Sequence, residues 1–156
     1  EKEDNLTHVY YTANNRKVYG GGGITPDIVA ESDFLTLFGA ELRRKNVFFN
    51  FTVDYLVEHN HQIDANFQIT DKIRDDFLNY ATKQDIKYTP ADLDSTDAYI
   101  RNTLKSEMVR KVQGDQEAYK ITITQDKQLM EAIGMFDRFK TLKEMFDYAA
   151  RAKKED

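Results

Sequence analysis

The sequence predicts a mainly α-helical protein that begins with a β-hairpin, and three observations lead to this fold class. Apolar residues recur at the three- and four-residue spacing of helices from Ser32 onward. Helix boundaries are marked as well, since Thr89-Pro90 is typical of a helix start and Gly114 of a helix end. The first segment differs, because β-branched and aromatic residues flank an asparagine turn there. We therefore expect two parts, residues 1–31 and a helical bundle-like domain of residues 32–156.

The predicted hairpin lies near the start of the chain. Its first strand is THVYYT, from Thr7 to Thr12, and Arg16 to Tyr19 forms the returning strand. Ala13-Asn14-Asn15 provides the turn, because asparagine tolerates the positive φ angles that turns require. Four glycines, Gly20 to Gly23, then allow a bend that other residues cannot adopt without strain.

The first predicted helices have recognisable caps. Ser32 is the expected N-cap of one long helix, or of two abutting helices, ending near Glu58. Thr70 and Thr89 are expected to cap the next two helices, the second of which ends at Gly114. The residues expected on the buried faces are Phe34, Leu35, Phe38, Leu42, Val47, Phe48, Phe49, Phe51, Val53, Tyr55, Leu56, Ile73, Phe77, Leu78, Ala81, Ile100, Leu104, Met108 and Val112.

Two further helices are predicted toward the end of the chain. One begins near Thr124, and the last begins at Thr141, which forms a capping box with Glu144. Helical spacing again assigns an apolar face to each. The residues expected on these two faces are Leu129, Met130, Ile133, Phe136, Leu142, Met145, Phe146 and Ala149.

Composition limits the chemistry available to the chain. With 156 residues, 40% of them apolar, and with ten Phe and nine Tyr, it can bury a core of its own. The absence of cysteine excludes disulfides, thiolate metal sites and cysteine nucleophiles. The net charge of −5 comes from interleaved acidic and basic residues, which argues against nucleic acid as a partner. No apolar run approaches the roughly 18 residues of a membrane-spanning helix, so no span is expected.

Two groups of residues resemble metal ligands. His59 and His61 could ligate a metal together, although no third ligand follows at a recognised spacing and helix-terminal histidines more often contact free carbonyls. Asp92, Asp94 and Asp97 resemble the front of a calcium loop, but an aspartate occupies the position of its invariant glycine. A negative first turn of a helix explains these aspartates equally well.

Catalytic motifs are absent from the sequence. No Lys-Ser/Thr follows Gly20 to Gly23, so these glycines do not form a P-loop. Ser32 has the position of a helix cap, and Ser95 and Ser106 lie on helices rather than on a strand-to-helix turn that presents a nucleophile. We therefore predict no catalytic, cofactor-binding or metal-binding residue in this chain.

The segment YYTANNRKVYGGGGITPDIVAE, from Tyr10 to Glu31, resembles the carboxyl-terminal processing proteases, also called tail-specific proteases. In that family a Tyr-Tyr-Thr strand, a turn ending in Gly-Arg, a second strand and Gly-Gly-Gly-Ile-x-Pro-Asp close the catalytic core. Asn15 departs from this pattern, because it stands where glycine usually precedes the arginine. The helical C-terminal region of one bacterial branch of the family is similar to Phe48–Asn60, Phe67–Leu93 and Glu117–Ile133.

The resemblance implies a parent protein that is a serine endopeptidase, cleaving proteins near their C-termini with a Ser-Lys dyad. In the family a PDZ domain, the serine and the lysine all precede the Pro26-Asp27 segment, and Lys17 does not match the catalytic lysine. This chain is therefore expected to be the non-catalytic C-terminal region and not itself an enzyme. Residues 1–31 would be the last β-hairpin and the glycine hinge of the α/β protease core, and residues 32–156 a helical C-terminal domain.

Partners and location follow from the same resemblance. The expected partners are the rest of the protease, with its PDZ domain and catalytic core, and a second copy that pairs with the exposed edges of the hairpin. The helical domain would pack on the core, mediate self-association or dock a partner, in the periplasm or cell envelope. The alternative left open is a stand-alone helical protein-interaction adaptor whose hairpin and glycines are native.

Overall fold

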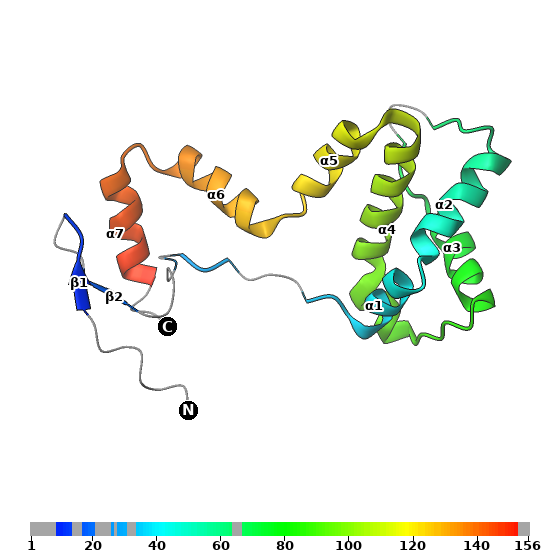
Figure 1. The fold of residues 1–156 in the computed structure, drawn as a ribbon, viewed down its shortest axis with the longest axis horizontal. Helices are drawn as coiled ribbons and strands as arrows, with labels where there is room; N and C mark the ends of the chain where they lie inside the picture. Colours follow the sequence, from blue (N-terminus) through cyan, green and yellow to red (C-terminus); the bar gives the residue numbers. More distant parts are fainter. Residues whose placement is uncertain are drawn as a thin grey trace. The chain divides into compact units, whose positions relative to one another are not determined.

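A computed structural model of the chain describes residues 9–13, 17–20, 26, 28–30, 34–63 and 67–152. Over these residues the fold is mainly helical, with seven helices and one two-stranded sheet, as the sequence predicts (Figure 1). The chain divides into two compact units, residues 31–133 and residues 1–30 with 134–156. We call the first of these the helical unit. The boundary expected after residue 31 separates the end of a protease core from a helical domain, and it stays a prediction.

The predicted hairpin is present and consists of β1 (Val9–Tyr11) and β2 (Lys17–Tyr19), which run antiparallel. The predicted strand residues Thr7, His8 and Arg16 lie outside the described residues, as do the turn residues Asn14 and Asn15 and the glycines Gly21 to Gly23. Thr12 follows the end of β1. The strand register pairs Val9 with Tyr19, Tyr10 with Val18 and Tyr11 with Lys17.

Of the two arrangements expected before residue 58, the structure has two abutting helices. These are α1 (Leu37–Arg44) and α2 (Val47–Glu58). Asn46 lies between them with a φ of 54°, in the left-handed region that asparagine tolerates better than most residues. This backbone turn changes the chain direction and allows α2 to pack on its neighbours independently of α1.

Helix α1 begins later than predicted. Ser32 lies outside the described residues, and the N-cap is Thr36, whose hydroxyl accepts a hydrogen bond of 3.0 Å from the Gly39 amide. The same hydroxyl lies 2.7 Å from that of Thr96, a buried residue of α4 (Pro90–Gln113). Phe34 precedes the helix and is 95% exposed, so its predicted burial is wrong.

Helix α3 (Asp71–Lys83) begins and packs as the sequence predicts. The Thr70 hydroxyl accepts a hydrogen bond of 3.3 Å from the Ile73 amide, which satisfies one of the free amides of the first turn. The predicted buried face is confirmed at every position. It consists of Ile73, Phe77, Leu78 and Ala81.

Helix α4 also carries its predicted signals. The Asp92 amide donates to the Thr89 hydroxyl at 3.2 Å, while the Thr89 amide donates to the Asp92 carboxylate at 2.8 Å, so the two form a capping box. Gly114 ends the helix with a φ of 96°, which favours glycine. Of the predicted apolar face, Ile100, Leu104 and Met108 are buried, whereas Val112 is exposed.

The chain after Gly114 contains one helix that was not predicted from the sequence. Gly114 leads directly into α5 (Asp115–Ile123), which packs along α4. Thr124 therefore follows the end of a helix, and α6 (Lys127–Arg138) begins after it. The predicted burial on α6 is wrong for several residues, namely Met130, Ile133 and Phe136, because their side chains are exposed.

Helix α7 (Leu142–Ala152) starts where predicted, with a modified cap. The Glu144 amide donates to the Thr141 hydroxyl at 3.3 Å, but the Glu144 carboxylate accepts from the Lys140 amide at 2.8 Å. Ala149 is buried as expected. Leu142 and Phe146 are exposed, contrary to the prediction.

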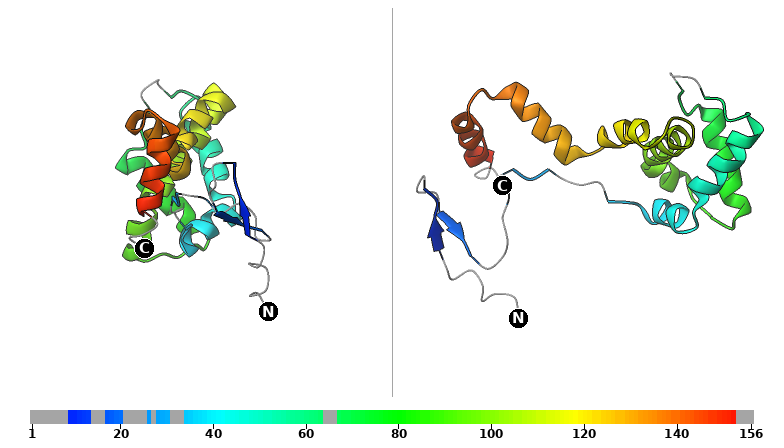
Figure 2. Two further views of the ribbon diagram at one scale, coloured as in Figure 1. Left: turned by 90° about the vertical axis from the view of Figure 1, so that its left-hand side faces the viewer. Right: turned by 45° about the horizontal axis from the view of Figure 1, so that its top comes forward.

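The core of the helical unit forms where α1 to α4 meet (Figure 2). Phe77 is fully buried, and its ring stacks on that of Phe48 with centroids 4.9 Å apart. Phe51 meets Phe77 edge to face at 5.4 Å, so three aromatic rings join α2 to α3. The buried cluster consists of Phe38, Leu42, Val47, Phe48, Phe51, Ile69, Ile73, Phe77, Leu78, Ala81, Ile86, Ile100, Leu104 and Met108.

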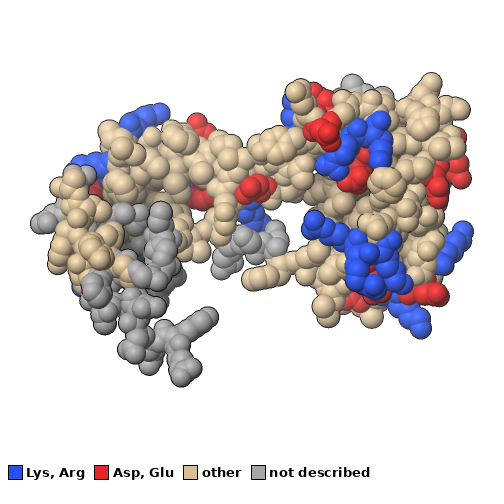
Figure 3. Space-filling model, viewed as in Figure 1, with Lys and Arg blue, Asp and Glu red and all other residues tan. Residues whose placement is uncertain are grey.

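Charged side chains add a second connection between α3 and α4. The Arg101 guanidinium contacts Asp97 at 2.7 Å and Asp71 at 2.5 Å, and Arg74 contacts Asp97 at 3.3 Å. Basic and acidic side chains also lie beside one another on the face of the helical unit drawn in Figure 3. Because such exposed pairs contribute little each, we attribute most of the stability to the aromatic core.

Replacing Phe51 by Ala should lower the free energy of unfolding by about 3–5 kcal/mol, because its buried ring fills the contact between α2 and α3. Phe49→Ala is the matched control, since Phe49 lies on the same helix but is exposed. Chemical denaturation of both variants measures the difference. Equal losses for the two substitutions would contradict the assignment of the core.

Asp92 should make the stability of the protein depend on acid pH. The Thr89 amide and hydroxyl both donate to its carboxylate, which lowers the Asp92 pKa in the folded state. Its contribution is therefore full above the unfolded value of about 3.9, and it is lost as the pH falls through the lower folded pKa. Asp92→Asn should melt at a lower temperature than the parent at pH 7, and this difference in melting temperature should decrease in acid. The exposed Asp94→Asn is the control, and a difference that stays constant with pH would refute the prediction.

Candidate functional site

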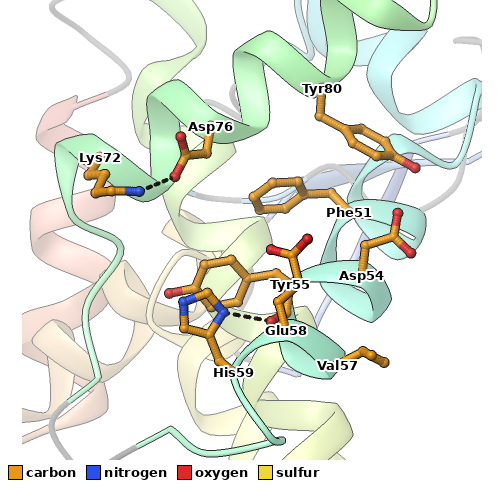
Figure 4. A pocket seen from close by; sticks show the side chains of 9 residues that line it. All are labelled: Phe51, Asp54, Tyr55, Val57, Glu58, His59, Lys72, Asp76 and Tyr80. Atoms are coloured by element: carbon orange, nitrogen blue, oxygen red, sulfur yellow. Dashed lines mark hydrogen bonds and ion pairs between the residues drawn. The ribbon is translucent and has the colours of Figure 1, made fainter.

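A groove between α2 and α3 carries both aromatic and charged side chains. It has a volume of about 610 Å³ and opens to solvent. We call it the α2–α3 groove. Figure 4 shows aromatic rings along its base and charged groups around them. The lining residues are Phe51, Asp54, Tyr55, Val57, Glu58, His59, Lys72, Asp76 and Tyr80.

Helical spacing places these side chains together. On α2, Phe51 and Tyr55 are four residues apart, as are Asp54 and Glu58, so each pair lies on one strip of the helix surface. On α3, Lys72, Asp76 and Tyr80 repeat the same spacing. The groove is thus formed by two adjacent strips of α2 facing one strip of α3.

The C-terminal end of α2 forms one side of the groove. The ring of His59 stacks on that of Tyr55 with centroids 4.0 Å apart and an interplanar angle of 15°. His59 Nδ1 also lies 2.8 Å from the Tyr55 carbonyl oxygen, so this nitrogen carries the proton and donates. The interpretation that a helix-terminal histidine contacts a carbonyl of its helix is confirmed for His59, although the Tyr55 carbonyl also accepts from the His59 amide at 3.1 Å.

An ion pair closes the α3 side of the groove. Lys72 Nζ lies 2.7 Å from Asp76 Oδ2, one helical turn away. The hydrogen bond to Asp76 and the negative charge of that carboxylate raise the Lys72 pKa. Burial raises the pKa of the nearby Tyr55 hydroxyl, opposed by the charge of Lys72 and assisted by that of Asp76. Lys72 therefore stays charged, and the Tyr55 hydroxyl stays protonated.

Tyr80 and Asp54 meet across the groove, one from each helix (Figure 4). Burial raises the Tyr80 pKa first, and the charge of Asp54 and a hydrogen bond to its carboxylate raise it further. The Tyr80 phenol therefore keeps its proton near neutral pH. Phe51 lies between the two tyrosines, 5.7 Å from the ring of Tyr80 and 5.8 Å from that of Tyr55.

This arrangement is suited to binding rather than to chemistry. The lining contains no serine, threonine, cysteine or free lysine amine that could act as a nucleophile. Both phenols have raised pKa values, so neither is poised to lose its proton near neutral pH. Aromatic faces beside carboxylates instead attract positively charged groups.

The serines that the sequence analysis rejected as nucleophiles, Ser95 and Ser106, lie elsewhere and have structural contacts. The Ser95 hydroxyl donates to the carbonyl oxygens of Ala91 and Asp92 at 3.0 Å each. The buried Ser106 hydroxyl lies 3.5 Å from the Ala118 carbonyl oxygen and helps to join α4 to α5. Neither serine is hydrogen-bonded to a histidine, carboxylate or amine among the residues that the structure describes.

The residues whose spacing resembles metal ligands have other contacts. His61 follows the end of α2 in the left-handed region, with a φ of 55°, and its amide donates to the Leu56 carbonyl. Asp92 belongs to the capping box, and Asp97 pairs with Arg101. Across the part of the chain that the structure describes, no three His, Cys, Asp or Glu side chains form a group that could hold a metal ion.

A second, smaller cavity of about 350 Å³ lies between α4 and α5. It is lined mainly by apolar atoms, and a hydrogen bond of 2.8 Å between Asn102 and Gln125 crosses its edge. Arg110 in its wall is already paired with Glu107 and with Asp115. Because its charges are paired internally, this cavity offers less to a ligand than the α2–α3 groove does.

Sequence reasoning identified many of the groove residues as helical but missed the groove itself. The signal that was available is the four-residue repeat of acidic and aromatic side chains on α2. What the sequence does not reveal is that α3 packs beside this face of α2. Among the described residues, no helix is long and apolar enough to cross a membrane.

Removing the charge of Asp54 should lower the Tyr80 pKa toward its ordinary value of about 10. Burial should keep it somewhat raised, because that cause is unchanged in Asp54→Asn. Following the Tyr80 ring carbon by NMR between about pH 8 and 12 measures the shift. Asp94→Asn, the control variant, should leave the Tyr80 pKa unchanged. A Tyr80 titration that is the same in Asp54→Asn and in the parent would show that the two groups do not interact.

The comparisons with known proteins identify one relationship. A family model described as "Family of unknown function (DUF8443)" matches residues 38–114. No curated protein and no solved structure matches the chain. The matched segment contains the whole buried cluster, from Phe38 to Met108, and it ends at the glycine that ends α4. The similarity therefore coincides with the packed unit of α1 to α4, which also holds the α2–α3 groove.

Proposed function

We propose that the chain is the non-catalytic C-terminal region of a carboxyl-terminal processing serine protease. The proposal rests first on the segment from Tyr10 to Glu31, with its Tyr-Tyr-Thr strand and its Gly-Gly-Gly-Ile-x-Pro-Asp pattern. In this proposal the parent cleaves proteins near their C-termini, in the periplasm or cell envelope. The role of the chain is to pack on the catalytic core, mediate self-association or dock a partner.

The structural observation that carries the proposal is a hairpin that no further strand joins within the described ranges. β1 pairs with β2 in a two-stranded sheet, and its side chains are exposed, with Val9 at 40%, Tyr10 at 56% and Tyr11 at 65%. A two-stranded hairpin is marginally stable in water, and side chains of this kind are typical of strands inside larger sheets. The remaining strands of a protease core would supply the missing neighbours.

The last two helices support the same proposal. Phe136 on α6 is 75% exposed and Leu142 on α7 is 71% exposed, although both follow the apolar periodicity of a buried face. Exposed apolar faces of this kind mark surfaces that contact another protein. In the proposed parent, the catalytic core or a second copy would cover them.

A stand-alone helical adaptor is the second candidate. The observation that favours it is the completeness of the helical unit, in which α1 to α4 bury a core without help from the hairpin. The family model of unknown function matches this same segment. An adaptor would use the helical unit for binding, and its hairpin would have a role of its own.

The coding sequence upstream of Glu1 distinguishes the two candidates. A PDZ-like segment followed by a serine and then a lysine on core elements is the result expected for a protease. The encoded protein should then cleave an unfolded substrate, and replacement of that serine by Ala should abolish cleavage. An initiation codon directly before Glu1, or an upstream segment that lacks the serine and the lysine, would refute the protease proposal and favour the adaptor.

A further inference from the structure

We propose that the α2–α3 groove binds the ammonium or guanidinium group of a lysine or arginine side chain on a protein segment. This inference goes beyond the proposed function, because it applies to the helical unit whether or not a protease precedes it. It is based on the aromatic lining of the groove, on its charge and on its open shape.

The aromatic lining provides surfaces that attract cations. Phe51, Tyr55 and Tyr80 all line the groove. Phe51 is buried and His59 covers one face of Tyr55, so the half-buried Tyr80 ring and the other face of Tyr55 are the surfaces offered to a ligand. The face of an aromatic ring carries partial negative charge, so a cation within about 6 Å of its centre is stabilised. Helix α2 already shows this contact on another part of its surface, where Lys111 Nζ lies 3.9 Å from the centre of the exposed Phe49 ring.

The charges of the lining favour a positively charged occupant. Asp54, Glu58 and Asp76 contribute three carboxylates, and Lys72 contributes one ammonium group. Lys72 lies against Asp76 at 2.7 Å, so this pair is balanced internally. Two carboxylates remain for a ligand, and an anionic ligand would be repelled by them.

The Asp54 and Glu58 carboxylates can both accept hydrogen bonds from a ligand. Asp54 is exposed, and a carboxylate has about four hydrogen-bonding positions, so it can accept from a ligand even beside Tyr80. Glu58 is exposed and is not paired with any residue that the structure describes. An ammonium or guanidinium group placed between them could therefore form charge-assisted hydrogen bonds while its aliphatic stem lies on the rings.

The shape of the groove favours a side chain of a docked segment over a bare metal ion or an enclosed small molecule. Its carboxylates belong to no described group that could hold a metal. A volume of about 610 Å³ is far larger than an ion, and pockets for small molecules enclose most of the ligand surface. This groove is open, with Val57 and Glu58 exposed among its lining residues, so a longer chain could continue past it on either side.

An NMR titration of the full chain tests the proposal. The probes are the blocked peptides acetyl-Ala-Lys-Ala-amide and acetyl-Ala-Arg-Ala-amide, with acetyl-Ala-norleucine-Ala-amide as the uncharged control. We expect the two cationic peptides to shift the amide signals of Asp54, Tyr55, Glu58 and Tyr80 in a saturable way that weakens with salt. Equal shifts from the norleucine peptide, or no shift from the cationic peptides, would overturn the proposal.

Two variants show whether the groove carboxylates are responsible. Glu58→Gln alone, and combined with Asp54→Asn, should weaken binding of the lysine peptide, by about tenfold for the double variant. Asp94→Asn removes one carboxylate from the exposed surface of α4 and should bind like the parent. If the double variant unfolds at a much lower temperature than the parent, the single variant Glu58→Gln decides the test. The Glu58 side chain is exposed and is not paired with any described residue, so its replacement should not disturb the fold. Parent-like binding by Glu58→Gln and by a folded double variant would refute the proposal.

A last titration separates a protein segment from a free organic cation. Putrescine carries ammonium groups on an aliphatic stem without a peptide backbone. Weaker binding of putrescine than of the lysine peptide supports a protein segment as the occupant. Equal or tighter binding of putrescine would overturn that assignment and indicate a small polyamine ligand instead.

Discussion

The burial of Phe77 is the constraint on which the helical unit depends. Its ring is enclosed by Phe48 and Phe51, and this contact fixes how α3 lies against α2. The same packing brings Tyr80, less than one turn further along α3, to the edge of the Phe51 ring. Phe51 therefore contacts Phe77 in the core and also lines the α2–α3 groove. Stability and the shape of the candidate site depend on the same aromatic contacts.

Local chemistry made α3 and α4 predictable. Thr70, Thr89 and Pro90 are positioned to satisfy or replace the free amides of a first turn, whatever the rest of the chain does. Gly114 is equally local, because its φ of 96° is unfavourable for other residues. The apolar face of α3 was predicted completely, since one stripe of that helix faces one core.

The features that were not predicted depend on which elements meet. Leu35 and Phe136 follow helical periodicity, but periodicity identifies an apolar stripe and not the partner that covers it. Thr52 shows the converse, because it is fully buried with no hydrogen-bond partner for its hydroxyl among the described residues, although threonine is usually exposed. The groove was missed for the same reason, since its two halves lie on separate helices.

Gly114 joins α4 to α5 without any intervening loop, so a change in chain length at this junction alters how α5 meets α4. One inserted residue that continued α4 would turn everything after it by about 100° around the helix axis. The face of α5 that holds Ala118 against Ser106 would then point away from α4. Homologous chains should therefore vary in length elsewhere, or replace α5 altogether. The match to the family of unknown function ends at this same glycine.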